Sequence, residues 1–263
     1  MALAAGDGVF STVLLEQGRA FGWRRHLRRL AASARALGLP EVDPDLVSSR
    51  AAQSLASSPG GRAARMRLRL LWAATDRGGA ALSIQLTPLP LAAGGARLVT
   101  STVRRTAAGA LGHHKTTAYV ENLVAAAQAR RAGGDEALLL TDAGQLCEGA
   151  GSNVFVVLDG EVLTPPLVSG CLPGIAREVL LERAQVRETD LEADVLARCA
   201  ELFVTSSTRE VQPVEWLRSA VAGPGEAVRG PQRSWPAPGP VTDSVRRIWQ
   251  DVREDPEEWF LLG

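Results

Sequence analysis

The chain has 263 residues, of which 46% are hydrophobic, and its formal net charge is zero at pH 7. The hydrophobic content is enough for the core of one large or two modest domains, and the balanced charge provides no field that would hold nucleic acid or an anionic membrane. Because no apolar run approaches the roughly 20 residues that span a bilayer, and the start of the chain lacks the basic segment of a signal peptide, we expect a globular cytoplasmic protein.

The first part of the chain mixes strand and helix patterns. Apolar runs bounded by turn residues predict strands at residues 9–16, 20–21, 66–73, 81–86 and 97–103. Helical spacing of apolar residues predicts a helix at residues 24–37 and another at 43–56, the second with Asp43 as N-cap and Pro44 in its first turn. These elements predict a small α+β domain over residues 1–106.

The second part begins after small residues at 107–112, which predict a linker. Helices are expected at residues 119–131, at 241–252, and from Pro173-Gly174 to residue 183. Short strands are expected at residues 137–140, 146–147, 153–158, 162–164, 200–204 and 211–217. Gly and Pro are frequent at residues 222–240 and predict an irregular loop. Closely spaced strands with interleaved helices predict a larger C-terminal domain over residues 113–263, with an α/β, barrel-like fold.

Lys115 is the only lysine among the 29 basic residues of the chain. Arginine suits ion pairs and solvated surface, but its guanidinium does not lose a proton at ordinary pH and so cannot attack a carbonyl. An amine with a tunable pKa can do so. The alternative is that a lysine-poor chain has simply kept one surface lysine.

Four other features suggest a cofactor site when they are taken together. Glu148 lies between a short strand and a glycine turn, where its carboxylate could face a pyridine nitrogen. Ile175 and Ala176 open a helix, whose free N–H groups bind anions, and Ser206-Ser207 follow a strand with further donors. Arg29 lies on the first basic helix. Singly, each has an ordinary explanation as a turn, a helix start or a solvated face, but jointly they fit a site for pyridoxal phosphate.

The three cysteines, Cys147, Cys171 and Cys199, are odd in number and have no CxxC spacing. This pattern favours neither a disulfide framework nor a metal site, so we expect no bound metal and interpret the cysteines as core or near-site thiols.

Six segments in one order carry a resemblance to a known family. They are GDGVF, HLRRLAASARALGL, KTTAYVEN, EALLLTDAGQLCEGAGSNVF, LTPPLVSGCLPGIAREVLLE and VTSSTREVQPV, which extend from Gly6 to Val214. The chain resembles the class IV aminotransferases, which are pyridoxal phosphate enzymes of fold type IV. The resemblance implies two domains, a small N-terminal α+β domain and a larger C-terminal one, and a homodimer.

The same resemblance implies a role for each candidate residue. Lys115 would form the Schiff base with pyridoxal 5'-phosphate, Glu148 would face the pyridine nitrogen, and Arg29 would bind the phosphate. The remaining phosphate donors would be Ile175, Ala176, Ser206 and Ser207.

Departures from the family pattern bear on the substrate. An extra strand usually precedes the GDG segment, so the first sheet is expected to lack an edge strand or the start to be truncated. Branched-chain aminotransferases tend to have a tyrosine five residues after the lysine, where this chain has Val120, with Tyr119 one position earlier. D-amino-acid aminotransferases use an Arg-x-His trap, and no histidine accompanies Arg67 or Arg69.

The sequence is closest in character to aminodeoxychorismate lyases. The leading hypothesis is therefore a lyase of folate biosynthesis that converts 4-amino-4-deoxychorismate into pyruvate and p-aminobenzoate. A class IV aminotransferase that moves the amino group of a branched-chain or D-amino acid to a 2-oxo acid is the alternative enzyme. A non-catalytic binding protein that retains the fold is the third hypothesis.

Overall fold

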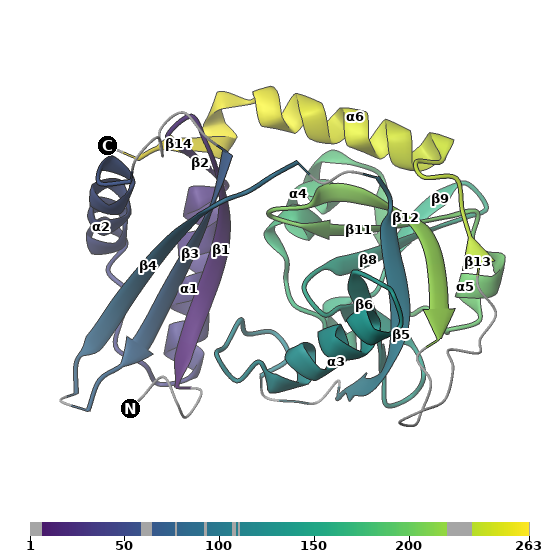
Figure 1. Cartoon of the computed structure of the whole chain (residues 1–263), viewed down its shortest axis with the longest axis horizontal. Coiled ribbons are helices and arrows are strands. Elements are labelled where there is room, and N and C mark those ends of the chain that lie inside the picture. The colour runs from purple at the N-terminus through teal and green to yellow at the C-terminus, as the bar shows by residue number, and fades with distance from the viewer. Residues whose placement is uncertain are drawn as a thin grey trace. The chain divides into compact units, whose positions relative to one another are not determined.

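A computed structural model of the chain describes residues 7–58, 65–76, 78–91, 94–106, 109, 111–219 and 233–262. The chain forms two compact units. The first unit comprises residues 1–91, 114–119 and 252–263, and the second comprises residues 92–113 and 120–251. The predicted mixed α/β fold with a curled sheet is confirmed (Figure 1). The expected partition into domains at residues 107–112 stays a proposal.

The first unit is built on a five-stranded antiparallel sheet with the order β14-β2-β1-β3-β4. Its strands are β1 (Gly8–Glu16), β2 (Arg19–Phe21), β3 (Arg65–Ala74), β4 (Ala80–Pro88) and β14 (Trp259–Leu261). The predicted hairpin between β1 and β2 is confirmed, and Gln17 and Gly18 turn it with positive φ angles of 51° and 76°. The sequence analysis missed β14, whose three residues pair with the free edge of β2.

Two helices, α1 (Trp23–Ala36) and α2 (Pro44–Ala56), cover one face of this sheet (Figure 1). The apolar stripe of α1 packs on β1, and Leu27 and Leu30 share one core with Val13 of β1 and Leu70 of β3. Asp43 caps α2 as predicted, because its Oδ1 accepts the N–H groups of residues 45 and 46 at 2.9 and 3.1 Å.

The second unit is built on a nine-stranded sheet in the order β10-β9-β8-β11-β12-β5-β6-β7, with β13 paired to β12. Its strands are β5 (Ala96–Arg105), β6 (Glu136–Thr141), β7 (Leu146–Gly149), β8 (Asn153–Leu158), β9 (Glu161–Thr164), β10 (Val186–Glu188), β11 (Glu201–Ser206), β12 (Glu210–Ser219) and β13 (Arg233–Ser234). The helices are α3 (Val120–Arg131), α4 (Ile175–Arg183), α5 (Val195–Arg198) and α6 (Pro240–Glu254), which continues into the first unit.

The partners of β5 differ from expectation. The sequence order predicts that residues 97–103 belong to the first domain, but β5 runs parallel between β12 and β6 in the second sheet. Its apolar pattern predicts a buried strand and contains no information about which strands pair with it. Most of the predicted loop at 222–240 lies outside the described residues, and β13 near its end pairs with β12.

Apolar side chains from the curled sheet form the main core of the second unit, and Phe155 of β8 stacks on Phe203 of β11 at 4.8 Å between ring centroids. A second cluster joins α3 to β5 and β6 through Ala125, Val99 and Leu139. No helix among the described residues is both long and apolar enough to cross a membrane.

We predict that Glu201→Gln destabilises the second unit. Glu201 is 3% exposed, and its two carboxylate oxygens accept the N–H groups of Val241 and Thr242 at 2.9 and 2.7 Å, at the start of α6. A glutamine has one acceptor oxygen, so one N–H group would lose its charged partner, at a cost of about 2 kcal/mol. Urea unfolding followed by circular dichroism measures this loss. The exposed residue Glu254 provides the matched control, and equal stability of Glu201→Gln and Glu254→Gln would contradict the prediction.

Candidate active site

Lys115 lies in the first unit, on a segment that pairs with β1. Its carbonyl oxygen accepts the N–H of Phe10 at 2.8 Å, and Thr116 forms a bridge to Val9. The Nζ atom of Lys115 lies 4.6 Å from the ring centroid of Phe10 and 5.6 Å from that of Tyr119. The GDGVF strand and the KTTAY segment, 105 positions apart at Phe10 and Lys115, therefore meet around one amine.

Two other features of the first unit lie near this amine, namely one further cation, Arg69, and one buried histidine, His26. The guanidinium carbon of Arg69 lies 4.4 Å from the ring centroid of Phe10, the same ring that Lys115 contacts. His26 of α1 is fully buried, and its Nδ1 lies 2.7 Å from Oγ of Ser11. Burial, and then the positive charges of Arg29 and Lys115, hold the pKa of His26 well below its usual value, so its imidazole is neutral. Arg29 and Lys115 are thus both close enough to act on one buried histidine.

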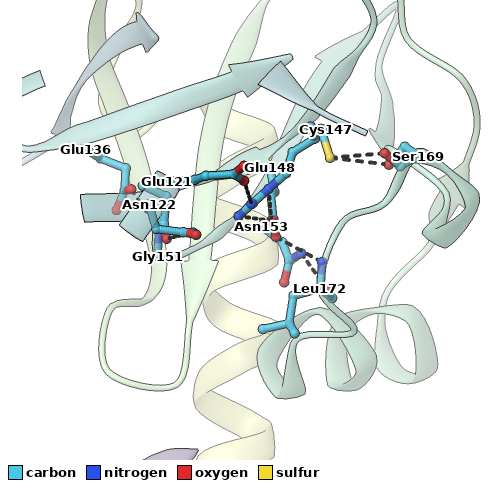
Figure 2. Close-up of polar contacts among 11 residues, drawn as sticks. Glu121, Asn122, Glu136, Cys147, Glu148, Gly151, Asn153, Ser169 and Leu172 are labelled. Atoms are coloured by element: carbon cyan, nitrogen blue, oxygen red, sulfur yellow. Dashed lines mark hydrogen bonds and ion pairs between the residues drawn. The ribbon is translucent and has the colours of Figure 1, made fainter. Parts of the chain in front are cut away.

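Glu148 lies in the second unit on β7 and is 5% exposed (Figure 2). Its Oε1 accepts hydrogen bonds from Nε and Nη2 of Arg105 at 3.1 and 3.0 Å, and its Oε2 accepts the backbone N–H of Leu172 at 2.9 Å. A guanidinium and a peptide donor both favour the charged carboxylate, which is the form needed to hold a protonated ring nitrogen. The sequence analysis missed Arg105, because only the paired strands β5 and β6 bring it beside Glu148.

The peptide of Leu172 connects Glu148 to the start of α4. Its N–H donates to Glu148, and its carbonyl accepts Nδ2 of Asn153 at 2.8 Å (Figure 2). A Cβ atom on Gly174 would lie 2.0 Å from Oδ1 of Asn153, so a larger residue there would have to displace the amide of Asn153. Gly174 gives α4 no side-chain cap, so the first N–H groups of the helix, near Ile175 and Ala176, are donors for an anion.

The turn after β11 lies next to the same asparagine. Thr205 pairs with Asn153 across β11 and β8, and Ser206 and Ser207 follow it. Oγ of Ser206 accepts the backbone N–H of Arg209 at 3.1 Å. Oγ1 of Thr205 is buried and makes no hydrogen bond to any described residue. This hydroxyl can therefore donate a hydrogen bond to a bound group or accept one from it. Asn153, which the sequence analysis did not single out, therefore adjoins both segments predicted to bind phosphate.

The residues of the second unit fit a cofactor that has an anionic end and a basic ring nitrogen. The uncapped start of α4 and the unpartnered hydroxyl of Thr205 suit the anion, and the carboxylate of Glu148 suits the ring nitrogen. The candidate residues Ile175, Ala176, Ser206, Ser207 and Glu148 all lie in this unit, whereas Lys115 and Arg29 lie in the first.

The cysteines do not compete with Lys115 as nucleophiles. Cys147 and Cys171 are buried free thiols that directly precede Glu148 and Leu172, respectively, in the sequence. Burial, and then the negative charge of Glu148, raise the pKa of both thiols, so they remain protonated and unreactive. Among the described residues, no group of three or more His, Cys, Asp or Glu side chains is arranged to hold a metal ion.

Comparison with known proteins identifies relatives over most of the chain. The family model "Amino-transferase class IV" matches residues 8–216. A putative branched-chain-amino-acid aminotransferase of Methanocaldococcus jannaschii is 30% identical over 269 residues, which cover 95% of this chain and 88% of that protein. A bifunctional aminodeoxychorismate lyase / D-amino acid transaminase of Mycobacterium tuberculosis is 32% identical over 225 residues, which cover 77% of each. The crystal structure of an Escherichia coli branched-chain amino acid aminotransferase superposes with a TM-score of 0.79 at 26% identity, over 94% of this chain and 85% of that one.

We predict that the neutral state of His26 makes the cofactor-free protein less stable as the pH falls. In the unfolded chain, His26 takes up a proton below its usual pKa of about 6.5, whereas the folded state does not until a lower pH. The free energy of unfolding should then decrease by up to about 1.4 kcal/mol per pH unit in that window. Urea unfolding at pH 7.5 and 5.5 measures the change, and His26→Gln, which keeps a partner for Ser11 but no titrating ring, should lose less. Equal decreases in the two proteins would contradict the prediction.

Proposed function

The chain belongs to the class IV aminotransferases, and on this premise we propose that it is a 4-amino-4-deoxychorismate lyase, which releases pyruvate and p-aminobenzoate. It is an enzyme, and its family uses pyridoxal 5'-phosphate. The observation that carries the proposal is the position of Lys115, the only lysine, against the rings of Phe10 and Tyr119. As the only lysine, it supplies the one side-chain amine that can form an imine with an aldehyde and carry a proton in the reaction.

The candidate residues named from the sequence are proposed to hold the cofactor. Glu148 would accept the hydrogen bond of the pyridine nitrogen, and Arg29 would bind the phosphate. Further phosphate donors would come from Ile175, Ala176, Ser206 and Ser207. When it is bound, pyridoxal phosphate supplies an aldehyde that takes up the amine of the substrate and a ring that withdraws electrons.

Lys115 is proposed to move the proton that the lyase reaction requires. Its Nζ takes the proton from the ring carbon that bears the amine, and the bond from the neighbouring ring carbon to the enolpyruvyl oxygen breaks. The ring becomes aromatic as p-aminobenzoate, and the departing enolpyruvate gains a proton to become pyruvate. Substrate and products then balance without an oxidant or a water molecule. General acid–base catalysis of this kind contributes about 10²–10⁴-fold to a rate.

Two observations favour the lyase. The relative from Mycobacterium tuberculosis, whose name includes this activity, aligns over 77% of the chain. In addition, the guanidinium of Arg69 lies over the Phe10 ring that Lys115 contacts. This guanidinium is proposed to pair with a carboxylate of the substrate. Aminodeoxychorismate carries two carboxylates, one on the ring and one on the enolpyruvyl group.

The second candidate is transfer of an amino group from a branched-chain or D-amino acid to a 2-oxo acid. The archaeal relative that aligns over 95% of the chain favours it, since its name is that of a branched-chain aminotransferase. Lys115 would act as acid and base in this reaction as well. Val120, which is 69% exposed at the start of α3, stands where those enzymes tend to have a tyrosine, and this difference weighs against the branched-chain substrate.

The remaining proposals concern assembly and location. We propose that the protein is a cytoplasmic homodimer with a small N-terminal and a larger C-terminal domain, and that it serves folate biosynthesis. These proposals rest on the family resemblance, and the measured mass in solution tests the dimer.

Two substrate mixtures distinguish the lyase from the transaminase. Purified protein with pyridoxal phosphate is given aminodeoxychorismate, or an amino acid (each branched-chain L-amino acid and D-alanine in turn) with 2-oxoglutarate. Because D-alanine also yields pyruvate, p-aminobenzoate is the diagnostic product. Formation of p-aminobenzoate and pyruvate in equal amounts supports the lyase, whereas transfer of the amino group without any p-aminobenzoate would overturn it.

We predict that Lys115→Arg folds normally but loses activity. A surface lysine would tolerate this change within about 0.5 kcal/mol and keep its function. At the proposed site, arginine can neither bind the aldehyde covalently nor carry a proton at neutral pH, so turnover should fall by at least about 10²–10⁴-fold. Borohydride reduction with peptide mapping locates the bound cofactor in the wild type. As Lys115 is the only lysine, a label on the N-terminal amine, or near-normal turnover of the variant, would refute its role.

We predict that Arg29→Ala weakens cofactor binding more than folding. Arg29 is half-buried on α1 and lies off the stripe of Leu27 and Leu30 that packs into the core. A charge-assisted bond to phosphate contributes roughly 1.5–3 kcal/mol, so the Kd for pyridoxal phosphate should rise about tenfold or more. Titration of the cofactor and a melt of the cofactor-free protein measure the two effects. Arg24→Ala, on an exposed arginine of the same helix, is the control, and an equal Kd in both variants would remove Arg29 from the site.

A further inference from the structure

Glu136 is a buried carboxylate that no step of the proposed reaction uses. It is the first residue of β6 and is 6% exposed. Its Oε1 accepts the backbone N–H of Gly151 at 3.0 Å, within the turn that follows Glu148, and Figure 2 draws it beside that turn. A buried carboxylate is costly, and burial raises the pKa of Glu136 against the opposing charge of Arg209.

Arg209 holds the other oxygen of this carboxylate. Its Nη2 lies 3.2 Å from Oε2 of Glu136 and also donates to the carbonyl of Asp135 at 3.1 Å. Arg209 belongs to the turn between β11 and β12, and its backbone N–H donates to Oγ of Ser206. The guanidinium therefore fixes the turn that carries Ser206 and Ser207 to the start of β6.

The two contacts of Glu136 join two segments that the sheet does not pair directly. One is the turn of Gly149 to Gly151, and the other is the turn that begins at Ser206. The first turn has little freedom of its own, because the N–H groups of Gly149, Ala150 and Gly151 all donate to acceptors in the unit and Asn122 donates to the carbonyl of Ala150 at 2.7 Å. Glu136 thus connects Arg209 to Gly151, which lies three residues after Glu148 in the sequence.

We propose that Glu136 and Arg209 are positioning residues, which fix the distance between the carboxylate that faces the pyridine nitrogen and the turn that binds the phosphate. This inference rests on the proposed function, since it takes the roles of Glu148, Ser206 and Ser207 from there. The cofactor is one rigid molecule with a ring at one end and a phosphate at the other. Both ends bind as a unit only when their two sites are held at the matching distance.

The test separates the two ends of the cofactor. Pyridoxal and inorganic phosphate bind as independent fragments, and pyridoxal phosphate binds both sites at once. The product of the two fragment Kd values divided by the Kd for pyridoxal phosphate is the effective concentration of one end for the other. If Glu136 sets the distance, Glu136→Gln should change each fragment Kd by no more than about twofold but lower the effective concentration about tenfold or more.

A double variant at Glu136 and Arg209 allows the test if Glu136→Gln alone unfolds the protein. Glu136→Gln places an amide against the guanidinium, whereas Glu136→Gln with Arg209→Gln pairs two neutral amides. If the two residues act as one link, the double variant should bind pyridoxal phosphate no more weakly than either single variant. Additive losses would overturn the link.

Glu201→Gln is the matched control, because Glu201 is also buried and also accepts backbone N–H groups, but at the start of α6. It should lower stability and leave the effective concentration unchanged. If Glu136→Gln behaves in the same way, or weakens the fragments as much as the whole cofactor, Glu136 has only a structural role and the inference is wrong. A wild type that does not bind pyridoxal phosphate at all would overturn the proposed function, and this inference with it.

Discussion

The candidate site in the second unit depends on the hydrogen bonds and the ion pair that satisfy the buried carboxylate of Glu148. A carboxylate that is 5% exposed needs partners that replace water, and here these are the guanidinium of Arg105 and the N–H of Leu172. Arg105 lies at the end of β5, and Leu172 lies in the segment before α4. The carboxylate of Glu148 therefore connects β7 to two segments that are distant from it in the sequence. The start of α4, where Ile175 and Ala176 lie, is fixed by the same interaction.

Two other buried carboxylates of the second unit are satisfied in a similar way. Glu136 accepts the N–H of Gly151 and pairs with Arg209, and Glu201 accepts two N–H groups at the start of α6. In each case, backbone donors or arginine, rather than lysine, meet the negative charge. An arginine-rich chain with one lysine therefore meets these buried charges with permanent cations and backbone donors.

In the first unit the amine of Lys115 is held differently, by aromatic rings and by backbone pairing to β1. The contacts to Phe10 and Tyr119 attract the ammonium form, whereas Arg69 on the same ring repels it. His26 is buried and neutral nearby, so it adds no further positive charge.

The sequence by itself determined most elements and the family. Alternating and helical spacing are local properties, so β1, α1, α2, β8 and α4 could be read from them, and the ordered motifs identified the class IV aminotransferases. Only the tertiary structure decided which strands pair, because an apolar strand such as β5 has no preference for a neighbour until the whole sheet forms. It also decided the partners of the candidate residues. Arg105, Asn153 and Arg209 look like ordinary polar residues in the sequence, and only pairing between segments far apart in the chain places them against Glu148, Leu172 and Glu136.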